Sequence, residues 1–270
     1  MKRQLHALAA AVLLSAASYA TAQANVGGLT IPAAPDGSTF AVASVYENVV
    51  TQVGDVLSGL GEVTQIGGVE IGSLCAGCEL TYRFGGYSVT SLSATDITFS
   101  GGWINFYLGF GADNDFNPFG SDSSGTDLAA ATNGTLFLTL SGHQIDAAGN
   151  TFAGTGRNIG TTSPAGFGAG LADVDDTGAM FGNTAGGGAI ANSLFNTNAI
   201  PADFGGPADF ALTSSFNALV LPHPGECPGG PMCVAGSADI RGVIPEPQTY
   251  ALLLAGLGAV GFVARRRRQS

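Results

Sequence analysis

The chain has 270 residues, which is enough for one large domain or two small ones. Only 11% of the residues are charged, 42 are glycine and 45% are apolar; this favours short strands and turns and excludes a charge-rich disordered segment. From Asn25 to Ile244 the chain carries nineteen acidic residues and three arginines, a net charge of about −16 that would repel phosphates, so we predict no binding to nucleic acid.

The N-terminus has the layout of a secretory signal peptide. Met1–Arg3 is short and positive, and the apolar, alanine-rich run LHALAAAVLLSAASYA follows it. Ala22 and Ala24 form an Ala-x-Ala cleavage pattern, so residues 1–24 are predicted to be removed and the mature chain to begin near Asn25. The alternative is an amphipathic first helix of a cytosolic domain, which the lack of a polar face in the run disfavours.

Short apolar alternations separated by Gly, Asn and Asp mark the body of the chain, residues 25–243. Thr81–Leu92 and Asp96–Phe110 are rich in aromatic and β-branched residues, and Gly134–Ile145 alternates leucine with threonine and phenylalanine. This spacing predicts an all-β fold, an antiparallel β-sandwich or jelly roll. The glycine-rich segment 149–207 has no visible period and is expected to form either a long loop region or irregular strands.

The body contains four cysteines: Cys75, Cys78, Cys227 and Cys233. An even number of cysteines in an exported chain favours disulfides, and we predict two local pairs because glycine and proline inside CAGC and CPGGPMC allow tight loops. A redox role for CAGC would need a helix N-terminus after a βαβ-type strand, which is not visible. A four-cysteine zinc site is the other alternative, disfavoured by the long second spacing and by export.

Two acidic segments resemble the first half of a calcium-binding loop. DNDFN alternates oxygen-bearing side chains from Asp113 to Asn117, and DVDDTG does so with Asp173, Asp175 and Thr177. Neither segment has the glutamate that closes such a loop at its twelfth position. We therefore expect solvated turns and no cofactor, with a structural calcium site at Asp173, Asp175 and Thr177 as the alternative.

The body shows no catalytic motif. It has neither a G-x-S-x-G nor an H-E-x-x-H pattern, and its only histidines are His143 and His223. We predict that the protein is not an enzyme. A secreted hydrolase that brings two carboxylates together in space is kept as the third functional alternative.

A glycan-binding module is the second functional alternative, because jelly rolls host lectins and aromatic side chains stack on sugar rings. The candidate aromatic residues are Tyr82, Tyr87, Trp103 and Tyr107. Their alternate positions fit core or cross-strand packing equally well.

The tail, residues 244–270, is built from three parts. Pro245, Glu246 and Pro247 form a box, and the apolar run 248–264 is at the short end of the length of a transmembrane helix. Four arginines follow and would hold this end in the cytoplasm: Arg265, Arg266, Arg267 and Arg268. A buried core helix is the alternative, which the adjoining arginines disfavour.

This tail resembles the PEP-CTERM sorting domain, in which a Pro-Glu-Pro box, a glycine-containing apolar helix and a basic cluster occur in this order. The resemblance implies a Gram-negative host that makes extracellular polysaccharide. It also implies export through the Sec translocon, inner-membrane transit by the C-terminal helix, and processing by an exosortase-type membrane enzyme. It implies no chemistry in the body.

We therefore predict an exported surface or extracellular-matrix protein with a structural or adhesive role in floc, biofilm or exopolysaccharide association. The layout is similar to that of flocculation-associated PEP-CTERM proteins, with Ser124–His143 as the shared element. Exopolysaccharide is the predicted partner besides the export machinery. A glycan- or calcium-binding β-sandwich module is the next alternative.

Overall fold

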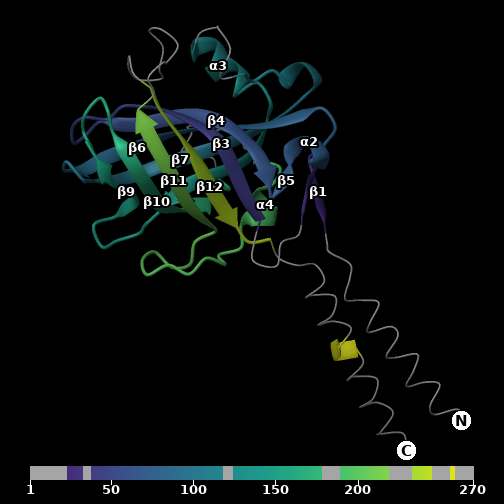
Figure 1. The fold of residues 1–270 in the computed structure, drawn as a ribbon. Helices are drawn as coiled ribbons and strands as arrows, with labels where there is room; N and C mark the ends of the chain where they lie inside the picture. The colour runs from purple at the N-terminus through teal and green to yellow at the C-terminus, as the bar shows by residue number, and fades with distance from the viewer. Residues whose placement is uncertain are drawn as a thin grey trace, which may run out of the picture. The chain divides into compact units, whose positions relative to one another are not determined.

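The protein is described by a computed structural model that covers residues 23–32, 38–117, 124–177, 189–218, 233–244 and 256–258. The compact body spans Asn25–Pro245. Long antiparallel strands dominate it, and the helices of the described residues are short (Figure 1). The predicted all-β class is confirmed.

Eight strands form a closed barrel in the order β11–β12–β3–β4–β6–β7–β8–β10, because β10 pairs back onto β11. Their bounds are β3 Ser38–Asn48, β4 Val56–Ile66, β6 Cys78–Leu92, β7 Asp96–Phe110, β8 Thr135–His143, β10 Ala165–Val174, β11 Phe210–Ala218 and β12 Cys233–Gly242. The predicted sandwich or jelly roll is not confirmed, since one sheet closes on itself where two stacked sheets were expected. Closure gives every strand of the ring two neighbours and leaves no long sheet edge.

The strand β9 (Asn150–Arg157) continues the line of β8 between β7 and β10. β8 pairs with the second half of β7, at Trp103↔Ser141, and β9 pairs with the first half, at Asp96↔Thr155. The segment without a visible period therefore contains two regular strands, β9 and β10. The position of the barrel between β7 and β10 is therefore filled by two short strands in succession.

Glycine on the inner face of β10 explains why its pattern was hidden. Gly166 and Gly170 point inward, and a Cβ atom on them would lie 2.8 Å from the ring of Phe216 and 2.6 Å from that of Phe152. The neighbouring strands thus supply the apolar groups that β10 itself lacks. Hydrophobic alternation is absent from the sequence although the face is buried.

Small elements close one end of the barrel and cover part of its outside. The hairpin of β1 (Ala24–Val26) and β2 (Leu29–Ile31), the strand β5 (Val69–Glu70), the helix α2 (Ile71–Leu74) and the 3-10 helix η2 (Gly111–Asp113) lie around the barrel. In α4 (Asn192–Phe195) the ring of Phe195 lies 5.4 Å from those of both Phe40 and Phe210. These three rings plug the end at which β3 and β11 begin.

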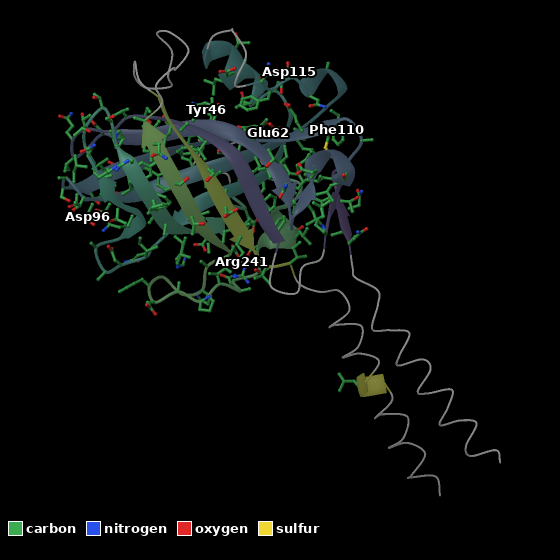
Figure 2. All side chains as sticks on the ribbon, viewed as in Figure 1. Tyr46, Glu62, Asp96, Phe110, Asp115 and Arg241 are labelled. Carbon is green, nitrogen blue, oxygen red and sulfur yellow. A yellow bond between two sulfur atoms is a disulfide. The ribbon has the colours of Figure 1, made fainter. Side chains whose placement is uncertain are left out.

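The helix α3 (Ser124–Ala130) belongs to a second, smaller apolar cluster on the outside of β4. The cluster contains Leu60, Phe116, Ala130 and Ala131, with Tyr46 packed against it. Figure 2 shows Tyr46, Glu62 and Asp115 on the side of the barrel that faces α3. The barrel therefore has an apolar interior and one covered outer face.

The predicted signal peptide and the predicted sorting tail lie mostly outside the described residues. This holds for residues 1–22 of the predicted signal peptide, for the Pro-Glu-Pro box and for the four arginines. Of the predicted apolar helix 248–264, residues 256–258 are described, and they are helical. Within the described ranges, no helix combines the length and the apolar character required to cross a bilayer.

Candidate functional site

Two adjoining cavities occupy the inside of the barrel. The larger has a volume of about 70 Å³ and lies among strands of the barrel wall, lined by Tyr82, Ile104 and Leu212 among others. The smaller has a volume of about 50 Å³ and reaches the barrel end at which β3 stops, next to Val50 and Pro164. Four side chains line both cavities: Glu47, Leu57, Phe152 and Ser214.

Glu47 is the acidic residue of this interior. Val45 and Glu47 point into the barrel, whereas Tyr46 between them packs in the outer cluster, as the alternation of a strand requires. Opposite Glu47 on β4 lies Gly59, and a Cβ atom there would stand 2.6 Å from the ring of Phe84. The backbone of Gly59 thus makes room for that ring beside the carboxyl group.

The carboxyl group of Glu47 has no hydrogen bond or ion pair to any described residue. Burial raises its pKa to about 8, so most molecules carry it protonated at pH 7. The other inward-facing side chains of the larger cavity that carry a hydroxyl are Tyr82, Tyr87 and Ser214. No lysine, arginine or histidine of the described chain lines either cavity.

Aromatic rings surround the carboxyl group. Neighbouring ring centroids lie 6.3 Å apart for Tyr82 and Phe84, 6.4 Å for Phe84 and Tyr87, and 5.9 Å for Tyr87 and Phe152. Tyr82 and Tyr87 are 3% and 4% exposed, and burial raises the pKa of both phenols. They are therefore inside the barrel and do not offer a surface to a polysaccharide.

Trp103 and Tyr107 lie on the outer face of β7 and are half-buried. A Cβ atom on Gly85 would lie 2.8 Å from the Trp103 ring, and the guanidinium carbon of Arg83 lies 5.7 Å from its centroid. The indole thus lies over the glycine pair of β6. Of the four aromatic candidates, these two keep outward-facing surface.

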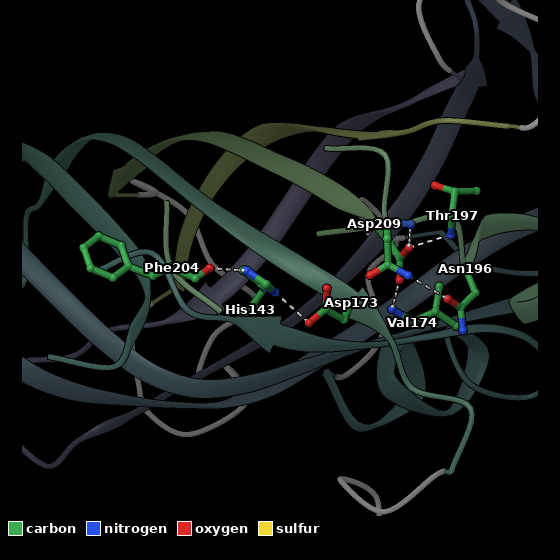
Figure 3. A network of polar contacts seen from close by, with 8 residues as sticks. His143, Asp173, Val174, Asn196, Thr197, Phe204 and Asp209 are labelled. Carbon is green, nitrogen blue, oxygen red and sulfur yellow. Dashed lines mark hydrogen bonds and ion pairs between the residues drawn. The ribbon is translucent and has the colours of Figure 1, made fainter. Parts of the chain in front are cut away.

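The second polar centre is the buried His143 at the end of β8 (Figure 3). Its Nδ1 lies 2.7 Å from Oδ2 of Asp173, and its Nε2 donates to the carbonyl oxygen of Phe204 at 2.8 Å. Burial would lower the pKa of His143, but the hydrogen bonds to Asp173 and Phe204 outweigh it and raise the pKa. Because both ring nitrogens are occupied, His143 has none left to activate a nucleophile.

Asp209 joins the start of the segment 196–209 to the end of β10 through backbone hydrogen bonds. Its carboxylate accepts backbone N–H groups of Thr197 and Asn198 at 2.6 Å each and of Val174 at 2.9 Å (Figure 3). Asn198 has a φ of +48°, a conformation that such bonds help to hold. Asp209 and His143 together fasten the segment 196–209 to β10, which is a structural task.

The residues of the predicted calcium loop are engaged elsewhere. Asp173 contacts His143, and Oδ1 of Asp175 accepts the backbone N–H of Thr177 at 3.0 Å and its hydroxyl at 2.7 Å. Among the described residues, no three acidic, histidine or cysteine side chains lie where they could share a metal ion. A calcium site at Asp173, Asp175 and Thr177 stays a prediction.

The structure describes the first cysteine pair in full and the second only in part. Cys75, directly after α2, and Cys78, the first residue of β6, are buried with Cα atoms 5.8 Å apart and bonded sulfur atoms. The helix precedes CAGC, so no helix N-terminus lies at this pair and the redox alternative gains no support. Cys227 and the side chain of Cys233 lie outside the described residues, and the two-disulfide framework stays a prediction.

A third polar centre lies under the outer cluster. Glu79 is 3% exposed, its Oε2 accepts the backbone N–H of Phe116 at 3.0 Å, and its Oε1 has no hydrogen-bond partner among the described residues. Burial raises its pKa to about 7, against the effect of the Phe116 hydrogen bond, and the nearby Glu62 and Asp115 add to the rise. This carboxyl group holds the segment after η2 against β6.

The sequence did not single out Glu47 or Glu79. Both stand in strands that alternate in and out. For Glu47 the available signal was a glutamate at an inward position of an otherwise apolar alternation, whereas Glu79 lies on the outer face of β6, under the outer cluster. That signal requires knowing which face of β3 is inside. The barrel closure provides this information and the local sequence does not.

The comparisons with known proteins concern the tail. No match to the chain was found among curated proteins or solved structures. Residues 243–268 match the family model of the PEP-CTERM protein-sorting motif, which includes Pro245, Glu246, Pro247 and Arg265–Arg268. The chain therefore carries this sorting motif, and the motif marks it as an exported protein processed by an exosortase.

Proposed function

We propose that this exported protein has a structural or adhesive role at the cell surface or in the extracellular matrix, in floc, biofilm or exopolysaccharide association. The sorting motif at residues 243–268 is the observation that carries the proposal, because it directs the body to the outside of the cell. The Sec translocon and the apolar run 248–264 serve in transit. The closed barrel supports this role, since a sheet without long open edges resists unwanted strand pairing in a crowded matrix.

The proposed function is not enzymatic. Both nitrogens of His143 are engaged in holding a loop, and Asp209 accepts three backbone hydrogen bonds. Each of these two polar centres has structural partners for its reactive atoms. This arrangement favours a scaffold over a hydrolase.

The test compares a gene deletion with a variant in which Pro245, Glu246 and Pro247 are all replaced by alanine. We expect the deletion to reduce cell aggregation and the box variant to accumulate unprocessed in the inner membrane. Complementation with the intact gene is the control. Wild-type protein recovered uncleaved from the inner membrane, or unchanged aggregation in the deletion strain, would refute the proposal.

A second candidate function is glycan binding at the outer face of β7. The indole of Trp103, lying over Gly85 with Arg83 beside it, is the kind of surface on which a sugar ring stacks. Affinity electrophoresis in gels that contain the host polysaccharide tests this candidate. Retardation that Trp103→Ala abolishes would support it, and equal mobility with and without polysaccharide would remove it.

A further inference from the structure

The inside of the barrel contains a carboxyl group without a positive partner among the described residues. Glu47 lines both cavities, and its carboxyl group makes no hydrogen bond or ion pair with a described residue. Folded proteins rarely keep an ionisable group in apolar surroundings unless something compensates its charge. No basic side chain of the described chain lines the cavities, so a cation that enters them would be the group that compensates the ionised form of Glu47.

The lining favours a cation that carries apolar groups. The rings of Tyr82, Phe84, Tyr87 and Phe152 follow one another at centroid distances of 5.9–6.4 Å around the larger cavity. Aromatic faces attract ammonium groups, and they attract them more strongly where water is excluded. Leucine, isoleucine and valine side chains complete the wall and would contact an apolar stem.

Size and access restrict the ligand. The volumes of about 70 Å³ and 50 Å³ are each below the roughly 150 Å³ of a cavity that takes up benzene, so a short and narrow molecule fits best. The smaller cavity reaches the barrel end opposite the Phe195 plug, which gives a route of entry. The acidic body attracts cations to its surface and disfavours anions.

We propose that the barrel interior binds a small organic cation, an ammonium group on a short apolar stem, with Glu47 holding the charge and the aromatic rings enclosing the stem. Tyr82 and Tyr87 are the other titratable groups that line the cavities in the described chain, and both stay neutral because burial raises the pKa of each phenol. Binding therefore follows the ionisation of Glu47. Affinity should increase as the pH rises from 6 to 8.5.

Calorimetric titration with n-butylammonium chloride tests the proposal at pH 8.5 and constant ionic strength. The neutral isostere n-butanol and the anion butyrate are titrated in parallel. We expect n-butylammonium to bind, and Glu47→Gln to weaken it roughly tenfold or more, as the loss of a charge-assisted hydrogen bond implies. Asp239→Asn is the matched control, because it removes one exposed carboxylate from the outside of the neighbouring strand β12 and should leave the affinity unchanged.

A second variant locates the bound cation. Ala238 lines the larger cavity, and Ala238→Leu should abolish binding by filling it while circular dichroism shows a folded barrel. The proposal is overturned if Ala238→Leu binds like the wild type, if n-butanol binds as tightly as the cation and is indifferent to Glu47→Gln, or if none of the probes binds.

Discussion

The carboxyl group of Glu47 makes the stability of the barrel depend on pH in an unusual direction. Its pKa is about 8 in the folded protein, whereas the ordinary value is 4.5. Between these two values the folded state binds more protons than the unfolded state, so the free energy of unfolding falls as the pH rises. Each pKa unit of this difference corresponds to about 1.4 kcal/mol in the free energy of unfolding. The free energy of unfolding lost between pH 4.5 and pH 8 therefore has an upper bound of about 5 kcal/mol.

Two other groups act in the same direction. Glu79, whose pKa is about 7, adds an upper bound of about 3 kcal/mol, lost between pH 4.5 and pH 7. The pKa of His143 is raised above 6.5, so its contribution is fully present below that pH and is lost as the pH rises through the folded value. The protein should therefore melt at a higher temperature at pH 5 than at pH 8.5.

The variant Glu47→Gln isolates the first contribution. We expect it to reduce the fall in melting temperature between pH 5 and pH 8.5 by roughly 10 °C, since about 1 kcal/mol corresponds to 2–4 °C in a domain of this size. Differential scanning calorimetry of wild type, Glu47→Gln and the exposed control Asp239→Asn measures it. Identical pH profiles for wild type and Glu47→Gln, or a wild type that gains stability toward pH 8.5, would refute the reasoning.

Three further predictions concern the polar centre and the glycine face. Asp209→Asn should cost about 1.5–3 kcal/mol and expose the segment 196–209 to limited proteolysis, whereas the exposed Asp203→Asn should do neither. Gly170→Val should cost about 1–3 kcal/mol in urea unfolding by crowding the ring of Phe152, and Ala169→Val on the outer face should cost much less. The melting temperature should be the same in calcium as in chelator, because Asp175 and Thr177 are hydrogen-bonded to each other. A higher melting temperature in calcium would instead support a calcium site in the DVDDTG loop.

The strands with side-chain alternation were predictable. Thr81–Leu92 and Asp96–Phe110 correspond to β6 and β7, and Gly134–Ile145 contains β8, because aromatic and β-branched residues alternate there. In β10 three inward positions, Gly166, Gly168 and Gly170, are glycine, and the rings that pack on them belong to Phe152 and Phe216 of neighbouring strands. A pattern read within one segment cannot detect a face whose side chains come from another segment.

Barrel closure and the interior site were beyond the reach of the sequence for a related reason. Whether a set of antiparallel strands forms two sheets or one ring depends on a single pairing, here β10 with β11. The paired residues run from Ala172↔Phe210 to Ala165↔Asn217 and are 38 to 52 positions apart. The inward direction of Glu47 follows from that closure. Local turn chemistry did predict the turn at Asp175, because a carboxylate that accepts a nearby backbone N–H group needs only a few residues of chain.

The effect of Glu47 on the stability of the barrel distinguishes a residue kept for ligand binding from a residue kept for packing. A glutamate retained for the fold would stabilise the barrel, and its replacement by glutamine would destabilise it at every pH. The pKa of about 8 implies the reverse at neutral and alkaline pH, where the ionised form opposes folding. Glu47→Gln is therefore expected to produce a more stable protein that has lost its affinity for an ammonium ion, a combination that arises when a binding group is kept in a site that does not favour its charge.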